Sequence, residues 1–320
     1  VNILKEKVIK IVCFLLIFVF ILSILSYIFA PKNNTKADGI YYETANGILG
    51  EPKDTIDVLI VGNSESYCSI IPMELWKNFG FTSYICGTPA QKLPDTLNYI
   101  YKATKNQTPK VLILEVDNVC VQSDITMPIE NIAKNIFPVI EYHNRWKSLK
   151  KTDFYEPIDY TWHDYLKGYN YSDVTFVADC KEYMKYTKET MKISETNKMY
   201  VKLIKKYCED NNIKFIMTSM PNTKNWNYKK HNSVKKFADE ENIEFLDLNA
   251  AKDELKIDWN TESRDAGDHL NYAGGLKATR YLGNYLNNKQ ILQDHRNDEN
   301  YSKEWNEDLA KYEELVEKDK

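Results

Sequence analysis

The chain has 320 residues, of which 43% are hydrophobic and 28% are charged, so it can build a sizeable folded core. Its 42 basic and 46 acidic residues give a formal net charge of -4. Binding to nucleic acid needs an excess of basic side chains that neutralise phosphates, so this balance argues against such a partner. Of the six cysteines, Cys13 lies in the apolar N-terminal segment, and the other five, an odd number without tight spacing, argue against a disulfide framework. No Cys-x-x-Cys pair is present, which argues against a structural zinc site.

Residues 11–30 are apolar except for two serines and one tyrosine. At a rise of about 1.5 Å per residue they form a helix about 30 Å long, enough to cross a bilayer core. Three lysines precede this segment, so the positive-inside rule places residues 1–10 in the cytoplasm and the rest of the chain outside. We therefore expect a single-pass membrane anchor. A cleaved signal peptide is the alternative, but the apolar segment is long for one and Pro31 follows Ala30 at a poor cleavage site.

Residues 31–55 are polar and predict a juxtamembrane linker. Beyond them, short apolar segments alternate with amphipathic ones, which is typical of buried parallel strands and the helices that cover them. The expected strands lie at 57–61, 82–86, 110–116, 214–219 and 244–248. We predict a three-layer α/β/α domain of the flavodoxin-like kind, with a five-stranded parallel sheet, over residues 56–287.

Two segments lack this alternation of short apolar and amphipathic stretches. Residues 121–190, rich in Tyr, Trp and Asp, predict a helical or irregular insertion over one edge of the sheet. Residues 288–320 are almost entirely polar and predict a solvated tail that carries no catalytic group.

The first candidate for chemistry is Ser64, in the segment Gly62-Asn63-Ser64-Glu65-Ser66 at the end of the first expected strand. In open α/β sheets, ligands bind beyond the carboxyl ends of the strands. A serine at this turn presents its hydroxyl there, and backbone N–H groups at the start of the next helix can stabilise an oxyanion. A strand followed by Gly-x-Ser is also common in proteins without this chemistry.

The second candidate is His269, in Asp265-Ala266-Gly267-Asp268-His269-Leu270-Asn271 after the last expected strand. A loop at that place reaches back to the same edge of the sheet, and a nearby carboxylate can orient the imidazole. A helix cap with a solvated histidine is the alternative interpretation.

Together the two motifs resemble the first and last sequence blocks of the SGNH (GDSL-like) hydrolase superfamily. Gly87, directly after the second strand, is similar to the glycine whose N–H serves that family's oxyanion hole. The resemblance spans about 55–287 and is best to the membrane-anchored branch that includes DltD-like and alginate-acetylation (AlgX/AlgJ-like) proteins. It implies a nucleophile at Ser64 and a general base at His269.

Two departures from the family pattern concern the same site. The family has Asp three residues before His, where this chain has Ala266, so Asp265 and Asp268 both remain candidates for the third member of the triad. Asp265 is favoured, because a side chain adjacent to His269 would point elsewhere. The Gly-x-Asn-Asp block is also missing, so Asn118 is a substitute donor to the oxyanion only if it is not simply a turn residue.

The resemblance implies acyl transfer outside the cytoplasm, through an acyl-Ser64 intermediate, onto a polysaccharide or another cell-surface polymer. It also implies a membrane-bound O-acyltransferase as partner, and no metal or other cofactor. Asp117 and Trp226 are the candidates for substrate binding, by hydrogen bonding and by stacking on a sugar ring. The alternatives are a carbohydrate esterase that removes acetyl groups and a catalytically idle scaffold of a polymer modification or export complex.

Overall fold

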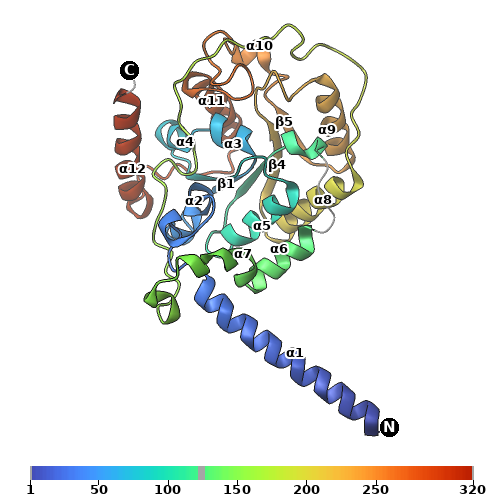
Figure 1. The fold of residues 1–320 in the computed structure, drawn as a ribbon. Coiled ribbons are helices and arrows are strands. Elements are labelled where there is room, and N and C mark those ends of the chain that lie inside the picture. Colours follow the sequence, from blue (N-terminus) through green and yellow to red (C-terminus); the bar gives the residue numbers. More distant parts are fainter. Residues whose placement is uncertain (1, 122–126, 319–320) are drawn as a thin grey trace. The chain divides into compact units, whose positions relative to one another are not determined.

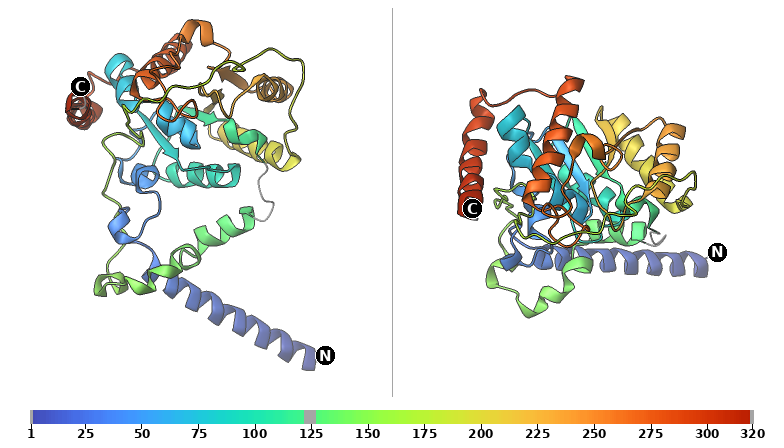
Figure 2. Two further views of the ribbon diagram at one scale, coloured as in Figure 1. Left: turned by 45° about the horizontal axis from the view of Figure 1, so that its top comes forward. Right: turned by 90° about the horizontal axis from the view of Figure 1, so that it is seen from above.

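A computed structural model of the chain describes residues 2–121 and 127–318, which form two compact units. Unit 1 combines Val1–Glu43 with Thr126–Trp162, and unit 2 combines Thr44–Ile125 with His163–Lys320. Each unit is built from two separate stretches of sequence, as the colours in Figures 1 and 2 show. These boundaries differ from the consecutive segments expected from the sequence, because packing joins residues that lie far apart along the chain.

Unit 1 begins with α1 (Asn2–Phe29), whose apolar side chains are exposed along most of its length. Among the described residues, its segment Ile3–Phe29 is long and apolar enough to cross a membrane. A membrane anchor and a signal sequence share these properties. The helix starts ahead of the apolar segment because the preceding residues, rich in Lys and Glu, are also good helix formers.

The rest of unit 1 consists of short helices, of which α7, η4 and η5 contact α1. Their bounds are η1 (Lys36–Asp38), α6 (Met127–Ile136), α7 (Val139–Tyr142), η4 (His143–Lys147) and η5 (Lys151–Phe154). The linker expected at 31–55 is instead folded, because Lys32 and Asn34 are buried in unit 1 and Ile48 and Glu51 are buried in unit 2.

Unit 2 contains a five-stranded parallel sheet in the order β2-β1-β3-β4-β5, which confirms the predicted fold class. The strands are β1 (Val58–Gly62), β2 (Ser83–Gly87), β3 (Val111–Glu115), β4 (Lys214–Ser219) and β5 (Glu244–Asp247). The first three are buried along their whole length, as strands covered on both faces must be. Gly62 pairs with Gly87, so β1 and β2 end side by side at the carboxyl edge.

Helices cover both faces of the sheet (Figure 1). On one face α11 packs against α3 and α4, and on the other α5 packs against α8, with α9 beside β5. This division follows from the right-handed crossovers that join parallel strands. The bounds in unit 2 are α2 (Glu43–Asn46), η2 (Gly47–Gly50), α3 (Ser64–Ser69), α4 (Pro72–Phe79), α5 (Leu93–Ala103), η3 (Asp117–Cys120), α8 (Glu195–Asp210), α9 (Tyr228–Glu240), α10 (Lys252–Leu255), α11 (Tyr272–Lys289) and α12 (Glu299–Lys318).

The insertion expected at 121–190 is not one cap over the sheet. Residues 122–126 of it lie outside the described part of the chain, and most of the remainder divides between the two units at Trp162. The stretch in unit 2 is irregular and is held by backbone hydrogen bonds. The N–H of Phe176 donates to Ser263 O at 2.8 Å, and the N–H of Tyr272 donates to Ser172 O at 2.7 Å. This stretch therefore packs beside the loop that carries His269.

The polar tail expected at 288–320 is also folded over its described residues. In α12 the side chains of Trp305, Tyr312 and Val316 are buried, and the ring of Trp305 lies 5.3 Å from that of Trp76 in α4. These residues recur at helical spacing within a polar segment, so they form one apolar stripe. The average composition of the segment does not show it. Residues 319–320 lie outside the description.

Candidate active site

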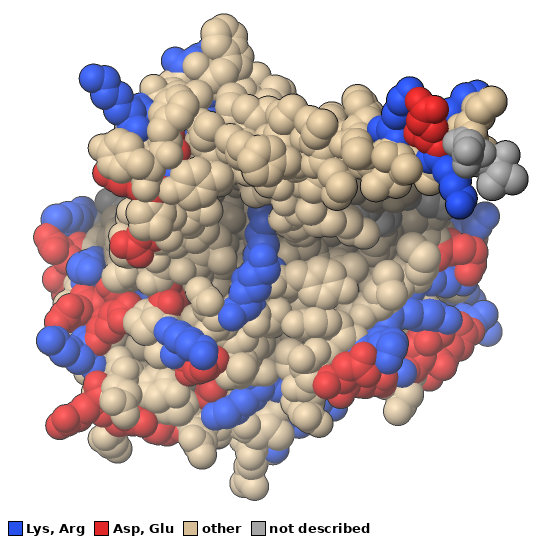
Figure 3. All heavy atoms as spheres, turned by 90° about the horizontal axis from the view of Figure 1, so that it is seen from below, with Lys and Arg blue, Asp and Glu red and all other residues tan. Residues whose placement is uncertain are grey.

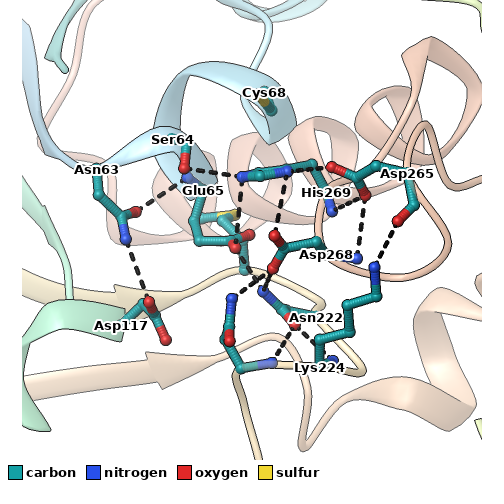
Figure 4. A network of polar contacts seen from close by, with 12 residues as sticks. Asn63, Ser64, Glu65, Cys68, Asp117, Asn222, Lys224, Asp265, Asp268 and His269 are labelled. Carbon is teal, nitrogen blue, oxygen red and sulfur yellow. Dashed lines mark hydrogen bonds and ion pairs between the residues drawn. The ribbon is translucent and has the colours of Figure 1, made fainter. Parts of the chain in front are cut away.

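Ser64 is the first residue of α3 and follows the end of β1 by one residue. Asn63 caps this helix, because its side-chain Oδ1 accepts a hydrogen bond from the N–H of Glu65 at 2.9 Å. The strand therefore ends in a sharp turn that leaves the Ser64 hydroxyl at the carboxyl edge of the sheet, as Figure 4 shows.

His269 lies in a loop between α10 and α11 that an antiparallel bridge, Ser263 with Leu270, closes at its base. The Ser263 hydroxyl accepts the N–H of Gly267 at 2.6 Å and donates to His269 O at 3.2 Å. The loop carries the imidazole to Ser64, whose Oγ lies 2.8 Å from His269 Nε2 (Figure 4). Two side chains 205 residues apart thus meet at hydrogen-bond distance.

Asp265 is the carboxylate that contacts the far nitrogen of the imidazole. Its Oδ2 lies 2.5 Å from His269 Nδ1, and its Oδ1 accepts the backbone N–H of His269 at 2.7 Å. Asp268 is farther away, with Oδ2 at 3.9 Å from Nδ1, and its Oδ1 accepts hydrogen bonds from the amides of Asn222 and Asn225. The arrangement Ser64–His269–Asp265 is therefore that of a nucleophile, a base and an orienting acid.

Glycine at position 267 makes this loop possible. Gly267 has a φ of +101°, and a Cβ on it would lie 2.0 Å from Thr223 Oγ1. Ala266 before it also has a positive φ, of 61°. Two successive residues in this region turn the chain tightly, so the carboxylate of Asp265 folds back onto His269 from four positions earlier.

Glu65, which has no role predicted from the sequence, lies on the inner side of His269. It is buried, its Oε1 is 3.8 Å from His269 Nε2, and that oxygen accepts a hydrogen bond from the amide of Asn222. Burial raises the pKa of Glu65 well above its usual range, and the neighbouring Glu115 carboxyl raises it further. The charged form of Glu65 is therefore disfavoured, which lowers its competition with Asp265 for the imidazole.

Two neighbours of Ser64 on α3 keep their protons. Burial raises the pKa of Tyr67 to about 12, against the effect of its hydrogen bond with the Ser64 side chain. Burial also raises the pKa of the Cys68 thiol to about 12, and its sulfur lies 2.9 Å from Arg264 Nη1. A thiol in this state is a poor nucleophile, so Cys68 does not compete with Ser64.

The expected oxyanion donors differ in their surroundings. Gly87 ends β2 beside α3, and a Cβ there would lie 2.8 Å from Ser66 Oγ, so only glycine allows this approach. Its backbone is thus next to the turn that carries Ser64. Asn118 lies in η3, where its amide donates to Gln91 O at 2.5 Å. One N–H of Asn118 therefore holds the loop after β2.

Neither candidate for substrate binding presents its side chain to a ligand. Trp226 is only 2% exposed, and its indole N–H donates to Asp247 Oδ2 at 3.2 Å. Asp117 is buried too, with its carboxylate bound to Asn63 Nδ2 at 3.2 Å and to Lys230 Nζ at 2.9 Å. Asp117 therefore holds Asn63, the residue before Ser64, while Trp226 packs in the core beside Phe245.

Glu65, Asp268 and His269 also lie close enough together to suggest a metal site. In the described structure, however, the two imidazole nitrogens face Ser64 and Asp265 at hydrogen-bond distance. The ring has no nitrogen left to bind an ion in this arrangement. These residues therefore fit proton transfer better than metal binding.

No protein-family model matches the chain, and no curated protein sequence matches it. Solved structures to which it is similar include one from Bacteroides fragilis assigned as an acylhydrolase, at 13% identity over 78% of this chain and 95% of the other, with a TM-score of 0.42. Another is a GDSL-like lipase from Bacteroides thetaiotaomicron, at 10% identity over 77% of this chain and 99% of the other, with a TM-score of 0.40. Sequence identities and TM-scores this low do not assign a function, so the geometry of the site has to indicate the chemistry.

Proposed function

We propose that the chain catalyses acyl transfer through an acyl-Ser64 intermediate. The contact of Ser64 Oγ with His269 Nε2 at 2.8 Å, with Asp265 on the other imidazole nitrogen, is the observation that supports it. Activation of a serine hydroxyl requires a base within hydrogen-bond reach and a group that holds that base in the right tautomer. Both are in place.

In the first step, His269 Nε2 takes the proton of Ser64 Oγ while that oxygen forms a bond to the carbonyl carbon of an ester or thioester. Asp265 accepts the hydrogen bond of Nδ1–H and stabilises the imidazolium that results. The carbonyl oxygen becomes an oxyanion, for which the backbone N–H groups of Ser64 and Gly87 are the proposed donors. Each such donor contributes about 3 kcal/mol to the transition state in well-studied enzymes.

In the second step, the tetrahedral intermediate breaks its bond to the leaving oxygen or sulfur, which takes the proton from His269. An acceptor hydroxyl then gives its proton to Nε2 and attacks the carbonyl of acyl-Ser64. The bond between the acyl carbon and Ser64 Oγ breaks, and Oγ takes the proton back from His269. Water as the acceptor makes the enzyme an esterase, and a sugar hydroxyl makes it an O-acyltransferase.

We favour the O-acyltransferase, acting outside the cytoplasm on a polysaccharide or another cell-surface polymer. The support is α1, since a tethered enzyme is suited to a polymer at the membrane surface. The proposed partner is a membrane-bound O-acyltransferase that delivers the acyl group. A carbohydrate esterase with the same site is the second candidate.

The nucleophile can be tested on the full-length protein in detergent with a fluorophosphonate probe and mass spectrometry. We expect the phosphonyl group on Ser64, no labelling of Ser64→Ala, and normal labelling of Ser66→Ala, a neighbouring serine on α3. Labelling that survives in Ser64→Ala would assign the nucleophile to another residue, and absence of labelling from the wild-type protein would favour an idle scaffold.

Transfer can be separated from hydrolysis with an acetyl ester donor and a deacetylated polysaccharide acceptor. We expect the acceptor to gain acetyl groups and to lower the yield of free acetate. Acetate release that is unaffected by the acceptor would support the esterase instead.

A further inference from the structure

Helix α6 of unit 1 presents a row of isoleucines to solvent. Ile129, Ile132 and Ile136 are 73%, 59% and 62% exposed. Their spacing of three and four residues places them on one face of the helix. Glu130 lies away from this row and pairs with Lys134 at 2.7 Å, so the helix has one apolar and one polar side. Large apolar groups clustered on a surface are characteristic of a contact with a partner or a membrane.

The segment after α6 adds aromatic side chains to this exposed surface. Trp146, Phe154 and Tyr155 are exposed, and so is Ile158. Tryptophan and tyrosine concentrate at the boundary between lipid headgroups and acyl chains, because each has an apolar ring and a polar atom. Phenylalanine and isoleucine belong on the apolar side of that boundary.

Hydrogen bonds attach this segment to the C-terminal end of α1, within unit 1. Arg145 donates through Nη1 to Phe29 O at 2.7 Å and through Nη2 to Asp153 Oδ1 at 2.8 Å. The hydroxyl of Tyr27 donates to Glu156 O at 2.9 Å. These bonds attach residues 145–156 to the last turns of the helix that is long enough to cross a membrane, and α6 is connected to the same helix through α7, which contacts both. Figure 3 shows uncharged side chains along α1, with charged ones gathered toward its N-terminal end.

We infer that residues 129–158 form a membrane-interface collar that rests in the surface of a phospholipid bilayer around the C-terminal end of α1. The 10 residues of α6 reach about 15 Å, too short to span a bilayer but suited to lie along its surface. Five basic and four acidic residues over 129–158 leave a formal charge of only +1, so neutral lipids suffice and the apolar side chains are the main contact. The inference depends on α1 lying in a bilayer and is independent of the acyl-transfer chemistry.

The test uses the full-length chain in phosphatidylcholine vesicles. Cys13, Cys120 and Cys180, the cysteines that are not buried, are changed to serine, and a cysteine introduced at Ile132 or Trp146 carries an environment-sensitive fluorophore. Glu130→Cys on the polar side of α6 is the matched control. A fourth protein keeps Cys13, which lies within α1, as a reporter of membrane insertion. Vesicles contain lipids brominated either near the headgroup or deep in the acyl chain.

An interfacial helix lies about 5–10 Å below the headgroups, so fluorophores at 132 and 146 should lose roughly half of their emission to the shallow bromines. The fluorophore at 130 should be quenched much less, and that at Cys13 should respond to the deep bromines.

Quenching at Cys13 without quenching at 132 and 146 would overturn the collar while leaving the anchor intact. Absence of quenching at Cys13 would overturn both. If the fluorophore at position 132 is protected from water in native membranes but not in vesicles, the apolar face of α6 contacts a protein and the lipid assignment is wrong.

Discussion

Two basic side chains of unit 2 are each paired with carboxylates, but in opposite surroundings. His269 faces Asp265, and their side chains are 16% and 37% exposed. Lys167 lies between Glu51 and Asp308, at 2.9 Å and 2.8 Å from Nζ, and all three side chains are at most 1% exposed. Solvent thus reaches the first pair and is excluded from the second.

The difference shows how one kind of pairing serves two purposes. The imidazole has Ser64 Oγ on its other nitrogen and can accept and return a proton, which our proposed mechanism uses. The ammonium has no route to solvent and stays charged, so its contacts join residues 51, 167 and 308 from distant parts of the chain. A buried charge costs free energy unless it is paired, and the pairing therefore fixes those segments to one another.

The largest effect on catalysis is expected at the solvent-accessible pair His269–Asp265, called the open pair below. Asp265→Asn should lower kcat/KM for an activated ester by about 10⁴-fold, because an amide does not hold the imidazole in the productive tautomer. Asp268→Asn should lower it by less than about tenfold, because that carboxylate is not hydrogen-bonded to the ring. Equal losses in the two variants, in steady-state assays of equally folded protein, would contradict the assignment of Asp265.

The buried contacts of Lys167 with Glu51 and Asp308, called the sealed pair below, should instead affect the stability of the fold. Lys167→Met leaves the buried Glu51 carboxyl without its ammonium partner, while Asp308 keeps Lys311 at 2.9 Å and His163 at 3.4 Å, so the free energy of unfolding should fall by about 3 kcal/mol. Urea denaturation followed by tryptophan fluorescence measures this loss. Lys185→Met, which breaks an exposed pair with Glu182, is the control and should leave the midpoint unchanged. A similar midpoint for both variants would show that the buried cluster is not needed for the fold.

The sealed pair also predicts a dependence on pH. Burial raises the pKa of Glu51 from 4.5 to about 7, although Lys167 is beside it. A carboxyl whose pKa is higher in the folded chain stabilises the fold fully below its unfolded pKa, and this contribution is lost as the pH rises through 7. Relative to Glu51→Gln, the wild-type protein should lose up to about 3 kcal/mol between pH 4.5 and 7. A difference that stays constant with pH would mean that Glu51 is ionised throughout.

The smallest effect is expected from Glu65→Gln beside the open pair. Because burial holds the pKa of Glu65 well above its usual range, an uncharged amide resembles the group already present. We expect kcat/KM near neutral pH to change by less than about threefold, with an unaltered pH profile. A displaced profile would show that Glu65 ionises in the working range and acts on His269 through its charge.

The strands and the meeting of Ser64 with His269 were predictable from the sequence. A strand buried on both faces is a short apolar segment in any sequence, and parallel strands bring their carboxyl ends to one edge. Asp265 was favoured over Asp268 because a side chain adjacent to His269 would point elsewhere. How its carboxylate returns to the ring was not predictable, because this depends on positive φ angles at Ala266 and Gly267. Backbone conformation at two residues decides which carboxylate meets the ring.

The burial of polar segments was also not predictable from the sequence. Lys167 and Glu51 are charged residues that usually lie on a surface, and only their pairing over 116 residues makes burial possible. Trp226 is typical of a sugar-stacking side chain, yet it fills the core because Asp247 accepts its N–H. Such outcomes depend on partners whose positions the local pattern does not contain.

The docking of α12 on α4 has a consequence for synthesis of the protein. Trp76 donates its indole N–H to Asn306, which lies 230 residues later in the chain. The helix that covers Trp76 is therefore synthesised long after Trp76 itself. At about 5–20 residues per second, this interval lasts roughly 10 to 50 s on the ribosome. During that time the apolar side of α4 is open to chaperones and to other nascent chains, and unit 2 completes its fold only after α12 has emerged.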